Sequence, residues 1–142
     1  GGTADMTATT DSHGNYKFIG LLNGEYFVTP DKTGYTFTPT HISLLINGGN
    51  VTGKNFTGIP THSISGTVMT STGIPLYGVT ITLSGDATAT VNTDYSGGYT
   101  FPALVNGNYT VTPSQEGYGF TPFNRDAPIS GADVTGQDFI RN

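Results

Sequence analysis

Short runs in which apolar and polar residues alternate recur along the chain, and clusters of Gly, Pro, Asn and Asp separate them. A period of two is typical of half-buried strands, and the clusters are typical of turns. In the C-terminal part the pattern predicts seven strands, at residues 63–68, 79–84, 88–92, 99–104, 109–113, a stretch ending at Phe120, and 134–140. Seven short strands in a segment of this length predict a β-sandwich.

The chain also repeats itself. Residues 1–59 align with residues 84–142 without a gap, each residue number being 83 higher in the second copy, and 26 of the 59 positions are identical. TDSHGNYKF at 10–18 returns as TDYSGGYTF at 93–101, and LLNGEYFVTP at 21–30 returns as LVNGNYTVTP at 104–113. Similarity at a fixed period indicates tandem structural units.

The two units predicted in this way differ in completeness. A complete unit spans 60–142, whereas the first copy, 1–59, lacks the counterpart of 60–83 at its N-terminus. In the complete copy the missing part corresponds to HSISGTVMTSTGIPLYGVTITLSG, at 62–85, which holds the first two predicted strands. We therefore expect an all-β protein with two tandem Greek-key, prealbumin- or immunoglobulin-like sandwich repeats, the first lacking about two strands.

Composition agrees with this class. The 142 residues include 21 Gly, 8 Pro and 25 Thr, while the good helix formers are scarce. Disorder is the competing interpretation of a chain rich in Thr and Gly. The eight Tyr and eight Phe argue against it, because buried rings offset the entropy cost of ordering the chain.

Charge and cysteine usage exclude several functions. The chain has no Cys, which rules out disulfides, thiolate metal sites and cysteine nucleophiles, and we expect no cofactor. A net charge of -5 disfavours nucleic acid and anionic membranes as partners. No apolar run reaches the roughly 20 residues of a membrane span, and no signal peptide is recognisable, so we expect a mature form or an excised piece.

Turn residues recur at matched positions. Asn23-Gly24 and Asn106-Gly107 have the composition of type I′ hairpin turns, in which both central residues have positive φ. Asp11 and Asp94 are expected to open turns that Gly14 and Gly97 close, with each carboxylate accepting backbone N–H bonds.

The order of these motifs resembles a known family. S-G-T-V at 65–68, G-V-T-I-T-L at 78–83, T-D-Y-S-G-G-Y-T-F at 93–101 and L-V-N-G-N-Y-T-V at 104–111 are similar to the carboxypeptidase regulatory-like (prealbumin-like) β-sandwich, close to B-type repeats of bacterial surface adhesins. The resemblance covers most of 62–142 and, truncated, 4–58. It implies a stalk, spacer or accessory module of a secreted or surface protein, although fold does not determine function.

The resemblance also raises the question of a crosslink. Many B-type repeats carry an internal Lys-to-Asn isopeptide bond. Residues 60–142 contain no Lys, so the complete unit cannot form one. Lys17, Lys32 and Lys54 lie in the truncated copy, where we do not expect one either.

Candidates for catalysis or metal binding are weak. His13, His41 and His62 have no histidine partner at a suitable spacing and no counterpart in the other repeat, so we expect them to be solvated. Asp11 and Asp94 supply one carboxylate per loop, which favours turn capping over calcium. No pair of facing carboxylates suits a glycosidase. The N-x-Thr sequons at Asn50, Asn55 and Asn108 are taken as incidental.

The aromatic residues fall into two groups. Phe27, Tyr77, Tyr95 and Phe123 have no aromatic counterpart in the other repeat, and we expect them to be exposed and available as a contact surface. The other twelve recur at matched positions and are expected to fill cores and anchor strand ends: Tyr16, Phe18, Tyr26, Tyr35, Phe37, Phe56, Tyr99, Phe101, Tyr109, Tyr118, Phe120 and Phe139. Without Trp, glycan binding is disfavoured.

The truncated copy suggests a function. A sandwich without two strands exposes unpaired backbone groups that template pairing with another chain. The chain holds two copies of the last five strands but one copy of the first two. We therefore expect a non-enzymatic subunit of an extracellular bacterial filament or surface structure, polymerising head to tail by strand complementation. The residues of the candidate assembly edge are Ala4, Met6, Thr7, Ala8, Thr9 and Thr10.

Two alternatives remain open. The chain is an excised stalk or spacer segment of a larger surface adhesin, or it is an accessory module that binds carbohydrate or other surface proteins.

Overall fold

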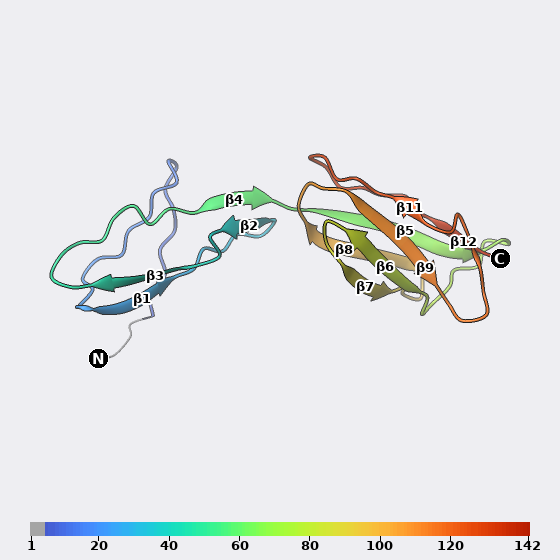
Figure 1. The fold of residues 1–142 in the computed structure, drawn as a ribbon, viewed down its shortest axis with the longest axis horizontal. Coiled ribbons are helices and arrows are strands. Elements are labelled where there is room, and N and C mark those ends of the chain that lie inside the picture. Colours follow the sequence, from blue (N-terminus) through green and yellow to red (C-terminus); the bar gives the residue numbers. More distant parts are fainter. Residues whose placement is uncertain (1–4) are drawn as a thin grey trace. The chain divides into compact units, whose positions relative to one another are not determined.

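Every regular element in residues 5–142, the part of the chain that the computed structural model describes, is a β-strand (Figure 1). The chain forms two compact units. The first unit comprises the residues up to Lys32 together with Phe37–Gly58, and the second comprises Thr33–Thr36 and Ile59–Asn142. The predicted all-β class is therefore confirmed.

The second unit is a sandwich of two four-stranded sheets, with strand orders β10-β12-β5-β8 and β11-β9-β6-β7. The long strand β5 pairs with β8 in antiparallel fashion and with β12 in parallel fashion, and β6 lies between β7 and β9 in antiparallel fashion. The strands of this unit are β5 (His62–Thr70), β6 (Thr80–Gly85), β7 (Ala89–Asn92), β8 (Gly98–Leu104), β9 (Tyr109–Ser114), β10 (Phe120–Thr121), β11 (Arg125–Asp126) and β12 (Phe139–Arg141).

A single apolar core lies between these two sheets. It contains 13 buried hydrophobic side chains, drawn from both layers. Alternation along the strands explains which of their residues are buried, since every second residue of a strand points to the same face of the sheet. The two central strands and the residue before β6 supply five of the 13, namely Ile64, Val68, Val79, Ile81 and Leu83.

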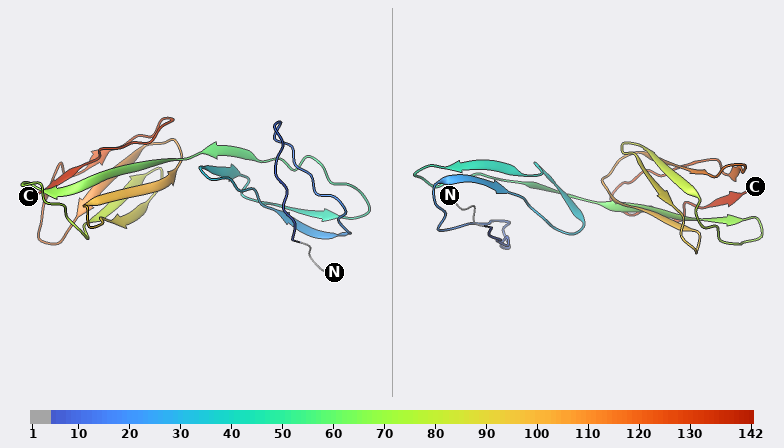
Figure 2. Two further views of the ribbon diagram at one scale, coloured as in Figure 1. Left: turned by 180° about the vertical axis from the view of Figure 1, so that it is seen from behind. Right: turned by 90° about the horizontal axis from the view of Figure 1, so that it is seen from below.

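The first unit contains less regular structure. Strand β1 (Gly24–Val28) pairs with β3 (Ile42–Ile46), and strand β2 (Tyr35–Thr38) pairs with β4 (Thr57–Pro60) (Figure 2). The boundary between the two units falls within β2 and β4.

Two sequence-based expectations need correction. The predicted strand 134–140 is shorter, because Val134 makes only an isolated bridge to Ile64 and the strand β12 begins at Phe139. In the first copy, the first two of the five expected strands are not formed within residues 5–21. Their counterparts β7 and β8 are held by β6 and β5, and a strand without a pairing neighbour has no ladder to stabilise it.

Candidate functional site

The strand pairs of the first unit repeat the register of strand pairs in the second. In the β1–β3 pair Val28 faces Ile42, and in the β9–β11 pair Val111 faces Arg125, each residue number being 83 higher. When 83 is added to their residue numbers, β2 overlaps β10 and β4 overlaps β12, and each of these two sets of strands is paired. One side of each sheet, the counterparts of the β9–β11 and β10–β12 pairs, is thus present in the first unit, whereas the counterparts of β7 and β8 on the other side form no strand.

The strands whose residues have no counterpart in the first copy, β5 and β6, are central ones. In the second unit β5 lies between β12 and β8, and β6 lies between β9 and β7. The described residues of the first unit contain no strand at either of these places. We call them the two unfilled strand positions, one in each sheet. Unpaired N–H and C=O groups next to such a position favour the addition of a strand.

Side-chain contacts of the second unit are also reproduced in the first. The hydroxyl of Tyr16 donates to the backbone oxygen of Lys54, as that of Tyr99 does to Gln137. The rings of Tyr16 and Phe18 meet edge to face at 5.9 Å and 70°, and those of Tyr99 and Phe101 at 6.0 Å and 69°. These contacts of the complete sandwich are therefore present in the first unit, although it has no strands at the places of β5 to β8.

The core of the first unit is open. Eight of the 13 core residues of the second unit have counterparts at residues 5–58, and all eight counterparts are only half-buried. No residue between positions 5 and 58 is buried. The counterparts are Tyr16, Phe18, Leu21, Tyr26, Val28, Leu44, Ile46 and Phe56. Apolar burial is the main stabilising term in folding. The first unit is therefore expected to become more stable when further apolar side chains cover these eight residues.

The candidate assembly edge corresponds in sequence to β7, the strand that lies beside β6 in the second unit. Met6–Thr10 are all exposed and form no strand, whereas their counterparts include β7 (Ala89–Asn92). Ala4, the remaining candidate, lies outside the described residues.

Thr10 shows what this edge lacks. Its counterpart Thr93 is 1% exposed; its Oγ1 accepts a bond from the Val79 N–H at 2.9 Å and donates one to the Leu76 oxygen at 2.6 Å. Within residues 5–142 the Thr10 hydroxyl has no such partner.

The turns at Asp11 and Asp94 are confirmed. Asp11 Oδ1 accepts bonds from the N–H groups of His13 and Asn15 at 2.8 and 2.9 Å, and Asp94 Oδ1 accepts bonds from Ser96 and Gly98 at the same distances. The bonds from Asn15 and His13 hold the pKa of the Asp11 carboxyl below its ordinary value. The closing residues Gly14 and Gly97 have φ of 79° and 74°.

The expectation of type I′ turns is wrong. Neither Asn23-Gly24 nor Asn106-Gly107 has a positive φ. Instead each Asn side chain reaches across the unit: Asn23 Oδ1 accepts the N–H of Gly48 at 2.8 Å, and Asn106 Oδ1 accepts that of Gly131 at 2.9 Å. The composition suggested a local hairpin turn, but a long-range hydrogen bond of the Asn side chain goes with a different backbone conformation here.

The four unmatched aromatic residues are exposed, as expected. Phe27 is 72% exposed, Tyr77 60%, Tyr95 84% and Phe123 76%. The rings of Tyr77 and Tyr95 stack with centroids 4.2 Å apart and an interplanar angle of 8°. Phe27 lies instead against His41, with centroids at 6.4 Å. Within the second unit, Tyr77 and Tyr95 therefore form an exposed pair of rings.

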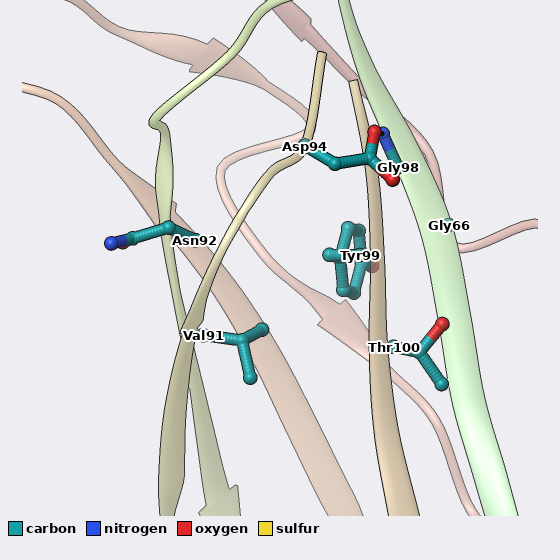
Figure 3. A pocket seen from close by; sticks show the side chains of 7 residues that line it. All are labelled: Gly66, Val91, Asn92, Asp94, Gly98, Tyr99 and Thr100. Atoms are coloured by element: carbon teal, nitrogen blue, oxygen red, sulfur yellow. Dashed lines mark hydrogen bonds between the residues drawn. The ribbon is translucent and has the colours of Figure 1, made fainter. Parts of the chain in front are cut away.

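A shallow hollow in the second unit has no catalytic character. It measures about 470 Å³ and is lined by Gly66, Val91, Asn92, Asp94, Gly98, Tyr99 and Thr100 (Figure 3). Its one carboxylate, Asp94, is engaged by two backbone N–H groups, and its one phenol, Tyr99, donates to Gln137. Burial raises the pKa of Tyr99 above its ordinary value, so this hydroxyl is neutral at physiological pH.

The histidines do not converge. His13 and His41 are exposed, and the half-buried His62 lies 3.7 Å from the carboxylate of Asp133. Among residues 5–142 no cluster of three or more His, Cys, Asp or Glu could hold a metal ion. The same part of the chain has no helix long and apolar enough to cross a membrane.

Residues 63–139 match the family model of the carboxypeptidase regulatory-like domain. The chain belongs to this family. The resemblance inferred from the motifs is thereby confirmed, and the carboxypeptidase regulatory-like sandwich is the second unit with its strands β5 to β12.

Curated proteins that are similar to this chain are much longer than it. Chitinase ChiA of Flavobacterium johnsoniae is 39% identical over 123 residues, which is 84% of this chain and 8% of that protein. Serine-aspartate repeat-containing protein F of Staphylococcus epidermidis is 36% identical over 167 residues, which is 91% of this chain and 9% of that protein. The chain spans about a tenth of the length of such relatives.

Solved structures with a similar fold include two pilins. A streptococcal ancillary pilin matches with a TM-score of 0.50 and 18% identity, over 85% of this chain and 45% of that one. The pilus 2b backbone protein of group B streptococcus matches with a TM-score of 0.50 and 15% identity, over 80% of this chain and 51% of that one. At this identity the likeness concerns the fold alone.

Sequence reasoning missed two residues of the second unit that show what the unfilled strand positions of the first unit lack. Gly66 in β5 and Thr93 after β7 looked like ordinary members of the family motifs. The signal that could have found Thr93 was its identity with Thr10, the residue at the matched position of the first repeat.

Proposed function

We propose that the chain is a non-enzymatic structural subunit of an extracellular bacterial surface assembly, and that it associates through β-strand complementation of an incomplete first repeat, residues 1–59. The observation that carries this proposal is the pair of unfilled strand positions, each bordered on one side by a strand pair that corresponds to a pair of the second unit. The fold shared with pilins and the similarity to a serine-aspartate repeat-containing protein support a surface role.

The candidate assembly edge Met6–Thr10 is part of this proposal. Its residues 6–9 match those of β7, which pairs with β6 in the second unit, and they are exposed. An added strand would satisfy its backbone groups and cover the half-buried rings of Tyr16 and Phe18.

The strand count favours a second candidate, a stalk or spacer segment of a larger surface protein. The chain contains one β5–β6 pair for two units. A copy that donates this pair to its neighbour opens its own second unit, so copies of this chain alone leave one unit of each copy incomplete. In a longer protein with more repeats, neighbouring sequence can supply the pair.

The exposed Tyr77–Tyr95 stack supports a third, carbohydrate-binding candidate, since sugars pack on aromatic faces. Retardation in polysaccharide gels that is lost in Tyr77→Ala and Tyr95→Ala, but kept in Phe27→Ala and Phe123→Ala, supports this candidate. Equal mobility of all these proteins with and without polysaccharide contradicts it.

Size-exclusion chromatography with light scattering, together with negative-stain electron microscopy, separates the first two candidates. Regular filaments that grow with protein concentration support self-assembly. A monomer of 14.8 kDa at all concentrations contradicts the homopolymer and leaves the stalk segment.

A further inference from the structure

The second unit shows what a strand contributes at the first unfilled position. The Ser65 N–H donates to the Val134 oxygen at 2.9 Å, and its oxygen accepts the Gln137 N–H at 3.0 Å. On the other edge the Val68 N–H donates to the Gly97 oxygen at 2.8 Å. Strand β5 is therefore bonded on both sides by backbone groups at fixed positions.

The same groups exist in the first unit without partners. The counterparts of Val134, Gln137 and Gly97 are Val51, Lys54 and Gly14. Within residues 5–142 the backbone N–H groups of Val51 and Lys54 donate to no acceptor, and the oxygens of Val51 and Gly14 accept no backbone bond. Val51 is also 37% exposed, whereas Val134 packs against the core.

Side-chain acceptors are preserved as well, with a change of charge. Asp133 Oδ1 accepts the Ser63 N–H at 2.9 Å, and Asp138 Oδ1 accepts the Thr67 N–H at 2.8 Å. Their counterparts are Asn50 and Asn55, whose amide oxygens can accept the same bonds without a negative charge.

One contact in the second unit selects a particular residue. A Cβ atom on Gly66 would overlap the Gln137 oxygen and would lie 2.8 Å from the Tyr99 hydroxyl. Real side chains do not tolerate such crowding, so β5 crosses the Tyr99–Gln137 bond only with glycine. Because Tyr16 and Lys54 make the same bond in the first unit, a strand entering there meets the same obstacle.

We infer that the two unfilled strand positions accept a strand pair of the β5–β6 pattern, and that Tyr16 and Lys54 act as a specificity gate that admits this pair only when glycine faces their hydrogen bond. The inference rests on the proposed strand complementation and names its partner. The partner carries apolar residues in the places of Ile64, Val68, Val79, Ile81 and Leu83, and glycine in the place of Gly66.

The test uses the full chain with a second copy of residues 60–83 joined directly to Gly1, which completes the first repeat and restores the regular spacing of the two repeats. Hydrogen–deuterium exchange is followed in the segments 15–21, 24–28 and 51–56, by mass spectrometry, at concentrations where light scattering gives a monomer. Exchange in these segments is expected to slow about 100-fold relative to the unextended chain, as in a region that opens only with its unit.

Two variants of the added copy test the gate. Gly66→Val in the added copy places a side chain against the Tyr16–Lys54 bond, and protection is expected to fall back to within a few-fold of the unextended chain. Thr82→Val places a valine in the same added copy at a residue whose original is exposed, and protection is expected to remain.

The outcomes separate the inference from the function on which it rests. If the unaltered extension gives no protection, strand complementation itself fails, and the inference fails with it. If the extension protects and the Gly66→Val copy protects equally well, complementation stands and the glycine gate is wrong. Protection lost in both variants also contradicts the gate, because the loss would not depend on glycine.

Discussion

The hydroxyl of Tyr99 donates its hydrogen bond to the backbone oxygen of Gln137, 38 residues away, and Tyr16 makes the same bond to Lys54 at the same separation. In the second unit β5 passes over this bond at Gly66, and in the first no strand does. The same polar contact is thus enclosed in one unit and accessible in the other, so equal substitutions in the two units have unequal effects.

Tyr99→Phe is expected to lower the free energy of unfolding of the second unit by about 1–2 kcal/mol, because it leaves a part-buried carbonyl oxygen without its donor. Tyr16→Phe is expected to have a smaller effect, since water reaches the half-buried site. Urea titration followed by NMR signals of each unit measures both, with the exposed Tyr95→Phe as control. A Tyr99→Phe protein as stable as the Tyr95→Phe control would contradict this account.

Stability of the second unit is expected to fall as pH rises past about 10. Burial, with a further contribution from Asp138, raises the pKa of Tyr99 above that of an unfolded tyrosine, near 10. Above that pH the unfolded chain loses the proton first, which draws the equilibrium toward unfolding by at most about 1.4 kcal/mol per pH unit. Unfolding curves from pH 8 to 11.5 should be steeper in pH for the wild type than for Tyr99→Phe; parallel curves would exclude Tyr99 as the source.

Thr93→Val keeps the shape of the side chain but removes both hydrogen bonds of its hydroxyl. The Val79 N–H and the Leu76 oxygen then lose a buried partner, and a loss of about 2 kcal/mol is expected. Thr90→Val, at an exposed position of the adjoining strand β7, serves as the matched control and should change stability by less than about 0.5 kcal/mol. Equal denaturation midpoints for the two variants would show that the Thr93 hydroxyl does not stabilise the unit.

Ala103 is the residue other than glycine with a positive φ among those described, at 60°, and its counterpart in the first unit is Gly20, at 72°. A Cβ atom is disfavoured in this left-handed region. Ala103→Gly is therefore expected to raise the stability of the second unit by roughly 0.5–1 kcal/mol, less the entropy that glycine adds to the unfolded chain. Thermal unfolding measures the change, and a lower melting temperature would show that the entropy term dominates.

The all-β class and much of the strand layout could be predicted, because alternation and turn composition are local properties of the sequence. The constant offset between the repeats also predicted which side chains recur, as with Tyr16 and Tyr99. The type I′ turns could not be judged locally: Asn23 bonds to Gly48 and Asn106 to Gly131, each 25 residues further along. Composition describes a turn only where no distant partner competes for its side chain.

The candidate site was predicted in outline and missed in detail. Counting strands indicated that an edge would be open near Met6–Thr10, but it did not reveal that one central position in each sheet is unfilled. The role of Gly66 depends on a bond between two residues far from it in sequence, Tyr99 and Gln137. Such three-body contacts leave no pattern in a single sequence.

The parallel pairing of β5 with β12 has a mechanical consequence. Val68, Met69 and Thr70 of the first strand of the unit face Phe139, Ile140 and Arg141 of the last. Because these terminal strands run in the same direction, tension applied through the two ends of the unit slides one strand along the other and strains all the bonds between them together. Single-molecule stretching should therefore show rupture of the second unit in one abrupt event; gradual peeling at low force would contradict this geometry. Such a unit extends little under a pull until its terminal ladder breaks.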